Sequence, residues 1–432
     1  MDKYTDTYYT QEAETSASAD SMEIELRKTI QRQKKTLFRL MEKINRLRIV
    51  CVILLVLLVI ESFLWWGDSS NNTVIPETAS TTTSENTDIT INIPEEKQEP
   101  ETVAKSFVHN VDEARIDSII SGMTLEQKVY QMIFTTPENL TGVPAVTVTG
   151  DTSKAAVEKF PVGGIIYSGK NIENKQQVSE MLSALKNFTK LGTFFAIEET
   201  GNDFVMTNPE VVTQGANLSF ATSADVASSY ASIGSELLSL GFNVNLAPYA
   251  EATDKSSDYF GADVQTTSDM VKSSVDAMSK ANLASAVRYF PSSENSTKLY
   301  SDMKNAEFMS FKAGIDAGAD FVFVSGKISG EGESYSLSSD YMTKALKTEL
   351  AFDGVVVADD ITSADISGRY TQEQAAVKAI NAGADMLVCP IGVANTVNAV
   401  LASIESGEIS EKTINDSVKR ILRVKLFRGI QK

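Results

Sequence analysis

Apolar and polar positions alternate in a regular rhythm over residues 103–432. Eight short runs rich in β-branched and aromatic residues predict strands, at 132–135, 164–167, 194–197, 244–247, 286–290, 321–324, 355–358 and 386–389. Segments with helical periodicity separate or follow them, at 175–188, 223–240, 268–281, 306–317, 339–350, 372–382, 393–403 and 410–427. Eight strands alternating with helices predict an α/β fold, a (β/α)8 TIM-type barrel, and a doubly wound open sheet is the alternative.

The polar residues that follow these strands are the first candidates for chemistry, because barrel enzymes place their sites at the C-terminal ends of the strands. These positions hold Glu198, Glu199, Glu251, Arg288, Ser325, Asp359, Asp360 and Pro390. No GxGxxG or GxxxxGK[ST] motif follows any predicted strand. The sequence therefore gives no support to nucleotide binding.

A different pattern precedes the barrel. Residues 49–66 form an apolar stretch of 18 residues, interrupted only by Glu61 and Ser62, and Trp65 and Trp66 close it. This length just spans a bilayer, and tryptophan favours the membrane interface. Residues 22–48 carry nine Lys/Arg against three Glu. The sequence predicts a single transmembrane anchor with a cytoplasmic N-terminus and an extracytoplasmic C-terminal domain; a cleaved signal peptide is the alternative.

Two further segments flank the predicted anchor. In residues 22–48, apolar residues at heptad spacing predict a short coiled coil that pairs two chains, and the alternative is one amphipathic helix lying on anionic lipid. Residues 67–102 are rich in Ser, Thr, Glu and Pro, which predicts a disordered stalk. Residues 1–21 are predicted to be a disordered cytoplasmic tail.

Net charge and the scarcity of histidine and cysteine limit the partners and the catalytic groups that this chain can use. The chain has a net charge of −18, and an acidic protein disfavours nucleic acid as a partner. His109 is its only histidine and is interpreted as a linker residue ahead of the barrel. The barrel therefore lacks the usual acid–base group and the commonest metal ligand. The two cysteines, Cys51 and Cys389, make no zinc or disulfide pattern, so we expect no metal and no cofactor.

Six segments then carry a resemblance to glycoside hydrolase family 3. Residues 352–361 read FDGVVVADDI, which resembles the family's FDGVVITDDL. Residues 123–128, 161–166, 241–248, 382–387 and 417–422 resemble, in the family's order, MTLEEK, PVGGII, GINVNFAP, AGADML and SVRRIL. The segments are most similar to the β-N-acetylhexosaminidase branch, which acts on cell-wall sugars. The resemblance implies the N-terminal (β/α)8 domain of that family.

The resemblance also implies roles for single residues. Asp359 stands at the position of the family's nucleophile. Asp360 follows it, and in a strand its side chain is expected to point to the opposite face. A retaining glycosidase needs a second group for proton transfer. The family's KHFPGHG is here RYFPSSE, at residues 288–294, and the histidine of the Asp-His dyad behind it is absent. Glu294 and Asp302 are the remaining acid–base candidates on this loop, and Glu198 is a third.

The family's sugar-binding positions have changed as well. Glu198 replaces an Asp, Asp203 replaces an Arg, and Asp258 reverses the charge of an Arg, whereas Arg288 and Tyr289 replace Lys-His. We take Glu198, Arg288, Tyr289 and Asp258 as the candidate substrate-binding residues. Glycines and apolar strand residues match while polar strand-end residues do not. This favours a domain that no longer cleaves glycosides and binds a cell-wall amino-sugar glycan or a surface protein; an active hexosaminidase and a structural spacer are the alternatives.

Overall fold

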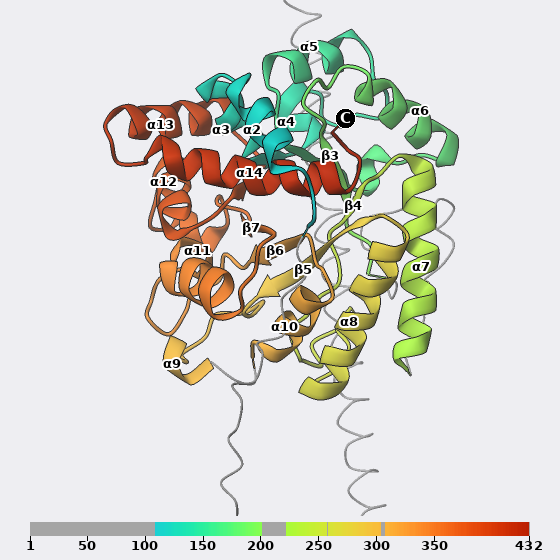
Figure 1. The fold of residues 1–432 in the computed structure, drawn as a ribbon, viewed down its shortest axis with the longest axis vertical. Helices are drawn as coiled ribbons and strands as arrows, with labels where there is room; N and C mark the ends of the chain where they lie inside the picture. The colour runs from blue at the N-terminus through green and yellow to red at the C-terminus, as the bar shows by residue number, and fades with distance from the viewer. Residues whose placement is uncertain (1–108, 201–221, 257, 304–306, 432) are drawn as a thin grey trace, which may run out of the picture. The chain divides into compact units, whose positions relative to one another are not determined.

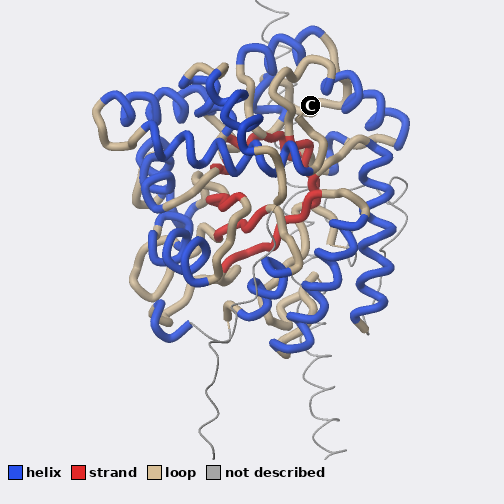
Figure 2. Tube along the Cα trace, in the orientation of Figure 1, coloured by secondary structure: helices blue, strands red, loops and turns tan. Residues whose placement is uncertain are grey.

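The computed structural model describes residues 109–200, 222–256, 258–303 and 307–431. In this part of the chain, eight parallel strands close into a barrel in sequence order, with the last strand pairing with the first (Figures 1 and 2). The strands are β1 Ile133–Thr135, β2 Gly164–Ile166, β3 Phe194–Ile197, β4 Val244–Asn245, β5 Ala284–Phe290, β6 Phe321–Val324, β7 Val355–Ala358 and β8 Met386–Val388. The predicted TIM-type barrel is confirmed, and the open-sheet alternative was wrong.

Helices surround this barrel (Figure 1). They are α2 Glu113–Ser121, α3 Leu125–Gln131, α4 Pro137–Thr141, α5 Asp151–Lys159, α6 Lys175–Lys186, α7 Ser223–Leu240, α8 Val264–Lys280, α9 Tyr300–Met303, α10 Met309–Asp316, α11 Ala364–Ser367, α12 Gln372–Ala382, α13 Val393–Glu405 and α14 Glu411–Phe427. The predicted helix at 339–350 is a π-helix, Asp340–Glu349. Short 3-10 turns lie at Gly169–Asn171 and Tyr335–Leu337.

Local sequence signals set several helix ends. Thr371 accepts a hydrogen bond from the backbone N–H of Gln374, whose side chain accepts one from the N–H of Thr371, so a capping box starts α12. The same reciprocal arrangement starts α3 and α7. Gly383 ends α12 with a φ of 115°, a backbone conformation that a side chain would strain.

The barrel interior is filled by aromatic rings. Phe134, Phe194 and Phe321 come from three different strands and are buried, with ring centres 5.0–5.9 Å apart. Both faces of a parallel strand are covered, by the barrel interior and by the helices, and this is why the strands appear in the sequence as unbroken apolar runs.

His109 is not a linker residue, so that interpretation was wrong. Its side chain is buried, with 2% of the residue exposed, and Nε2 lies 2.9 Å from Oδ1 of Asp320. The Arg428 guanidinium binds the same carboxylate through Nε and Nη2, both at 2.9 Å. Asp320 directly precedes β6, so this cluster lies at the N-terminal end of the barrel. It ties the segment before α2 to the segment after α14.

The predictions for residues 1–108 lie outside the described residues. These are the tail at 1–21, the coiled coil at 22–48, the anchor at 49–66 and the stalk at 67–102. Among the residues that the structure does describe, none of the helices combines the length and apolarity that crossing a membrane requires.

Candidate functional site

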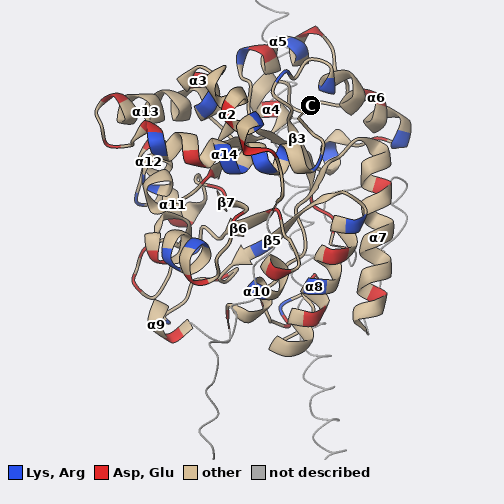
Figure 3. Cartoon of the chain, viewed as in Figure 1, with Lys and Arg blue, Asp and Glu red and all other residues tan. Residues whose placement is uncertain are grey.

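Arg288, near the end of β5, joins two carboxylates from other strands. It is the basic residue of the β5 sequence ASAVRYF. Basic and acidic residues also lie along the helices around the barrel (Figure 3). Nη1 of Arg288 lies 2.9 Å from Oε2 of Glu198, which follows β3, and its Nη2 lies 3.0 Å from Oδ2 of Asp359, which follows β7. Only 7% of Arg288 is exposed. The structure thus brings together three of the residues singled out in the sequence.

We call Glu198, Arg288 and Asp359 the triad. For Glu198 and for Arg288, burial and the partner in the ion pair shift the pKa in opposite directions. Burial raises the pKa of Glu198, and the Arg288 guanidinium opposes that rise without cancelling it. Burial also acts to lower the pKa of Arg288, but Tyr289, Asp359 and Glu198 outweigh it, and the pKa is raised. The guanidinium therefore stays charged. Arg288 lies between the Glu198 and Asp359 carboxyl groups, so its single positive charge faces both of them.

Three tyrosines pack beside the triad. The Tyr249 hydroxyl donates a hydrogen bond to Oε1 of Glu198. The Tyr289 ring lies 5.0 Å from that of Tyr249 and faces the Arg288 guanidinium at 4.3 Å. Tyr259 adds a third ring, 5.2 Å from Tyr249. Arg288 is therefore held by its ion pairs with Glu198 and Asp359 and by the contact of its guanidinium with the Tyr289 ring.

A cavity of about 220 Å³ opens at this end of the barrel. Its lining comes from the end of β5, the loops after β5, β6 and β7, and α11. It consists of Tyr289, Ser293, Ser325, Gly326, Lys327, Asp359, Asp360, Ser363 and Asp365. Asp359 and Asp360 both line it, so the expectation that they face opposite ways was wrong. The reason is that β7 ends at Ala358, and Asp360 instead accepts hydrogen bonds from the backbone N–H and hydroxyl of Thr362 in a turn.

The two loop candidates for proton transfer lie elsewhere. The Glu294 side chain is 66% exposed, lies 3.5 Å from Nζ of Lys255 and lines a neighbouring hollow of about 330 Å³. Asp302 is exposed on α9 and accepts a hydrogen bond from the hydroxyl of Ser301. Neither residue is among those that line the cavity beside Asp359.

Asp258 has a local partner. Its carboxylate accepts a hydrogen bond from the Thr200 hydroxyl at 2.7 Å and thereby connects the end of β3 to the loop after β4. The segment that begins at residue 201, including Asp203, lies outside the described residues.

Sequence reasoning missed Tyr249 and the ion pair between Lys327 and Asp365, which are 2.8 Å apart. Tyr249 lies just beyond β4, so the strand-end rule that selected Glu251 could have found it. The ion pair joins the loop after β6 to α11, 38 positions apart. No local sequence pattern predicts such a contact.

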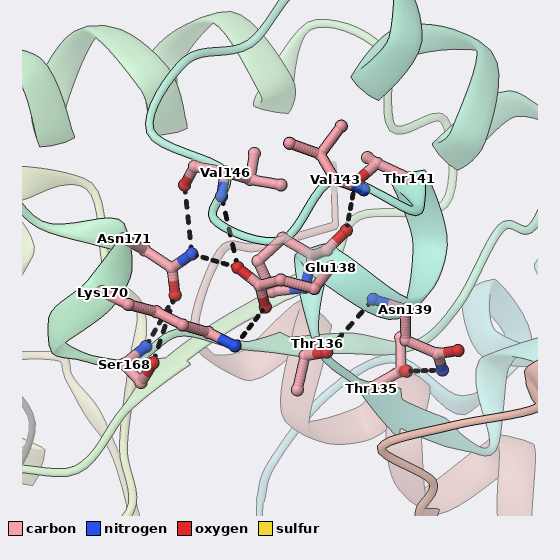
Figure 4. Close-up of polar contacts among 11 residues, drawn as sticks. Thr135, Thr136, Glu138, Asn139, Thr141, Val143, Val146, Ser168, Lys170 and Asn171 are labelled. Carbon is pink, nitrogen blue, oxygen red and sulfur yellow. Dashed lines mark hydrogen bonds and ion pairs between the residues drawn. The ribbon is translucent and has the colours of Figure 1, made fainter. Parts of the chain in front are cut away.

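A second polar cluster lies after β1 and β2 (Figure 4). Glu138 Oε1 accepts hydrogen bonds from the side chain of Asn171 and from the backbone N–H of Val146, and Oε2 lies 3.3 Å from Nζ of Lys170. These contacts hold α4 against the 3-10 turn at Gly169–Asn171. Across the described ranges, no three His, Cys, Asp or Glu side chains gather in a geometry that could hold a metal ion.

Comparison with known proteins gives this site a context. The model of the glycosyl hydrolase family 3 N-terminal domain matches residues 124–424. The chain is 25% identical to beta-hexosaminidase A of Pseudoalteromonas piscicida, over 65% of this chain and 56% of that protein. The structure of a family 3 beta-N-acetylglucosaminidase from Paenibacillus sp. str. FPU-7 superposes with a TM-score of 0.65 and 25% identity, over 72% of this chain and 63% of that one. The chain thus spans less than two thirds of either.

A third similarity concerns the fold alone. The crystal structure of a beta-N-acetylhexosaminidase from Beutenbergia cavernae superposes with a TM-score of 0.61 at 20% identity, over 71% of this chain and 99% of that one.

Proposed function

Because the chain belongs to glycosyl hydrolase family 3, we propose that its strand-end cavity binds an amino-sugar glycan without hydrolysing it. The resemblance expected from the sequence motifs is confirmed, and the relatives and neighbours named as hexosaminidases support an amino sugar as the ligand class. A surface protein as the ligand is the other outcome of the test described below.

The single observation that carries the proposal is the ion pair between Arg288 and Asp359. A retaining glycosidase uses a free carboxylate to attack the anomeric carbon and to balance the positive charge of the transition state. Here the guanidinium already neutralises Asp359 and occupies one of its oxygens. The same guanidinium also pairs with Glu198, so Asp359 stands in a buried ion network and not as the free carboxylate that this chemistry uses.

Proton transfer meets a second obstacle. A general acid that works near neutral pH needs a raised pKa. Among the described residues, Glu198 is the carboxyl group with a raised pKa, but it lies behind Arg288 and is not part of the cavity lining. Asp365 does line the cavity, but the hydrogen bond from Lys327 lowers its pKa and keeps it ionised.

The test is a turnover assay on the full-length chain purified in detergent. A fluorogenic β-N-acetylglucosaminide is incubated with the wild type and with Asp359→Asn, and binding of a cell-wall glycan is measured on the same samples. We expect equal background fluorescence from both proteins and saturable glycan binding. Turnover that disappears in Asp359→Asn would instead establish an active hydrolase with Asp359 as its nucleophile, and binding of a surface protein without glycan binding would exclude the glycan.

We also propose, from the sequence alone, that residues 49–66 anchor the chain in a membrane with the barrel outside, and that residues 22–48 pair two chains. Protease added to intact cells should then degrade the barrel and spare the N-terminal segment. Crosslinking should yield a dimer that is lost when residues 22–48 are deleted.

A further inference from the structure

Hydrogen bonds connect the buried Glu198 carboxyl group to the strand-end cavity through two tyrosines. The Tyr249 hydroxyl donates a hydrogen bond to Oε1 of Glu198, and the Tyr289 hydroxyl donates one to the Tyr249 hydroxyl at 3.4 Å. Glu198 and Tyr249 are buried, with 6% and 8% of each residue exposed, whereas Tyr289 lines the cavity. Among the described residues, Glu198 and Tyr289 are the hydrogen-bond partners of the Tyr249 hydroxyl. A change at Glu198 can therefore reach the cavity through Tyr249.

Arg288 decides which oxygen of Glu198 can carry a proton. Oε2 of Glu198 accepts a hydrogen bond from Nη1 of Arg288 at 2.9 Å. A guanidinium has donors and no acceptor, so a proton on Oε2 would face another hydrogen. The proton of a neutral Glu198 therefore belongs on Oε1, where it points at the Tyr249 oxygen.

The direction of the hydrogen bonds then depends on that proton. Each tyrosine hydroxyl has a single hydrogen to donate. With Glu198 ionised, Tyr289 donates to Tyr249 and Tyr249 donates to Glu198, so the Tyr289 oxygen offers its lone pairs to the cavity. With Glu198 protonated, Glu198 donates to Tyr249 and Tyr249 donates to Tyr289. The Tyr289 hydrogen is then free to be donated to a ligand.

The groups around Glu198 set the pH at which this reversal occurs. They are Arg288 on β5, Asp359 after β7, and Tyr249 and Asp258 in the loop after β4. Burial raises the pKa of Glu198, Arg288 opposes the rise, and the charges of Asp359 and Asp258 add to it. Because the pKa is raised, Glu198 takes up its proton at a higher pH than an ordinary glutamate when the pH falls.

We propose that Tyr249 is a positioning residue that transmits the protonation of Glu198 to the Tyr289 hydroxyl, so that the cavity binds a hydrogen-bond acceptor of its ligand, such as an acetamide carbonyl, more tightly as the pH falls. The inference rests on the proposed glycan-binding function and adds its regulation by pH. The reversal changes the direction of hydrogen bonds and needs no change in the ion pair between Arg288 and Asp359. It is therefore compatible with binding without hydrolysis.

Calorimetric titration of the full-length chain tests this regulation. The probe is the β-1,4-linked dimer of N-acetylglucosamine, titrated at pH 7.5 and at pH 5. We expect about three- to tenfold tighter binding at pH 5, the effect of one additional hydrogen bond. Because coupling between a ligand and a proton is reciprocal, binding must also take up protons between these pH values. Titrations in buffers of different ionisation enthalpy measure that uptake.

Tyr249→Phe is the informative variant, because phenylalanine keeps the ring and removes the hydroxyl that links Glu198 to Tyr289. Glu198 still titrates in this variant, so an effect of its charge alone would be retained. With an unchanged Tm, the affinity should differ by less than about twofold between the two pH values, since no hydrogen bond is gained. Tyr289→Phe, at a half-buried position, should lose the pH dependence in the same way. Tyr370→Phe removes a hydroxyl that binds Glu333 outside the cavity and should keep the wild-type pH dependence.

A measurement without ligand separates this regulation from glycan binding. The Raman doublet of tyrosine differs between a hydroxyl that donates and one that accepts a hydrogen bond. The difference between the spectra of the wild type and Tyr289→Phe isolates the signal of Tyr289. We expect that signal to change between pH 7.5 and pH 5, and to stay constant when the same pair of spectra is recorded in the Tyr249→Phe background.

Each contrary outcome has a defined meaning. Equal affinity of the wild type at both pH values overturns the regulation and leaves glycan binding intact. A pH dependence that persists in Tyr249→Phe means that charge acts on the ligand without the tyrosines, which also overturns the role of Tyr249. If the dimer binds at neither pH, the proposed function fails, and a constant Tyr289 signal then overturns the reversal as well.

Discussion

The Arg288 guanidinium lies 3.0 Å from the Asp359 carboxylate, although the two residues are 71 positions apart in the chain. Arg288 binds Glu198 through its other terminal nitrogen at 2.9 Å. Arg288 therefore links the ends of β3 and β7 to β5, so the centre of the candidate site also contributes to the stability of the barrel.

Replacing Arg288 by methionine should therefore destabilise the domain strongly. Glu198 and Asp359 would lose their counter-charge in a buried place, and breaking a buried pair on one side costs about 3–5 kcal/mol. We expect this loss in the free energy of unfolding by urea at pH 7.5. The loss should be smaller at pH 5, because burial raises the pKa of Glu198 and this carboxyl group can then take up a proton. Arg115→Met, at an exposed position of α2, should have little effect at either pH.

Asp320→Asn should weaken the N-terminal end of the barrel in a pH-dependent way. Burial acts to raise the pKa of Asp320, but Arg428 and His109 outweigh it and hold the pKa below its usual range. The ion pairs therefore contribute stability above the unfolded-state pKa of about 3.9, and this is lost as the pH falls through the folded-state pKa. The variant should lose about 3–5 kcal/mol at pH 7, and the gap from the wild type should narrow below pH ~4. Urea titrations across that range measure it; a gap independent of pH would contradict the assignment.

His109→Ala should have a milder effect at the same end of the barrel. It removes one hydrogen bond to Asp320 and the edge-to-face contact with Phe427, whose ring centre is 5.0 Å away. We expect a loss of about 1–3 kcal/mol, typical of a broken buried hydrogen bond. An unchanged free energy of unfolding would return His109 to the role of a linker residue.

Lys425 should make stability increase with pH above neutrality. Its amine is buried, binds Oε1 of Gln131 and the carbonyl of Gly192, and burial lowers its pKa to about 7. An unfolded lysine titrates near 10.4, so between the two values the unfolded state binds more protons and stability rises with pH. Unfolding free energies at pH 7, 8 and 9 should rise more steeply for the wild type than for Lys425→Met. Lys412→Met, on the exposed face of α14, should keep the wild-type slope.

Gly163 should tolerate no side chain. A Cβ atom added there would lie 1.9 Å from the carbonyl oxygen of Gln131, so the backbone before β2 would have to move. We expect Gly163→Ala to lower the free energy of unfolding by more than 2 kcal/mol, in the range seen for overpacked cores. Gly122→Ala is the control, because its added Cβ meets only ordinary contacts of 3.5 Å or more, and it should be neutral or slightly stabilising. Comparable losses in both variants would contradict this reading of the packing.

The sequence by itself determined the barrel. A parallel strand buried on both faces must be apolar along its length, so all eight strands could be located from composition and spacing. The strand-end rule also selected Glu198, Arg288 and Asp359 before their contacts were known. Local patterns suffice here because the burial of a strand and the position of its end are properties of consecutive residues.

Only the tertiary structure decided which polar groups meet. His109 pairs with a carboxylate 211 positions away, and Arg288 reaches two loops 90 and 71 positions away. The direction of the Asp360 side chain depended on where β7 ends, at Ala358, two residues before Asp360. Hydrophobic periodicity records which positions are buried, but the partner of a buried charge is set by how distant segments pack, and that information is absent from any short stretch of the chain.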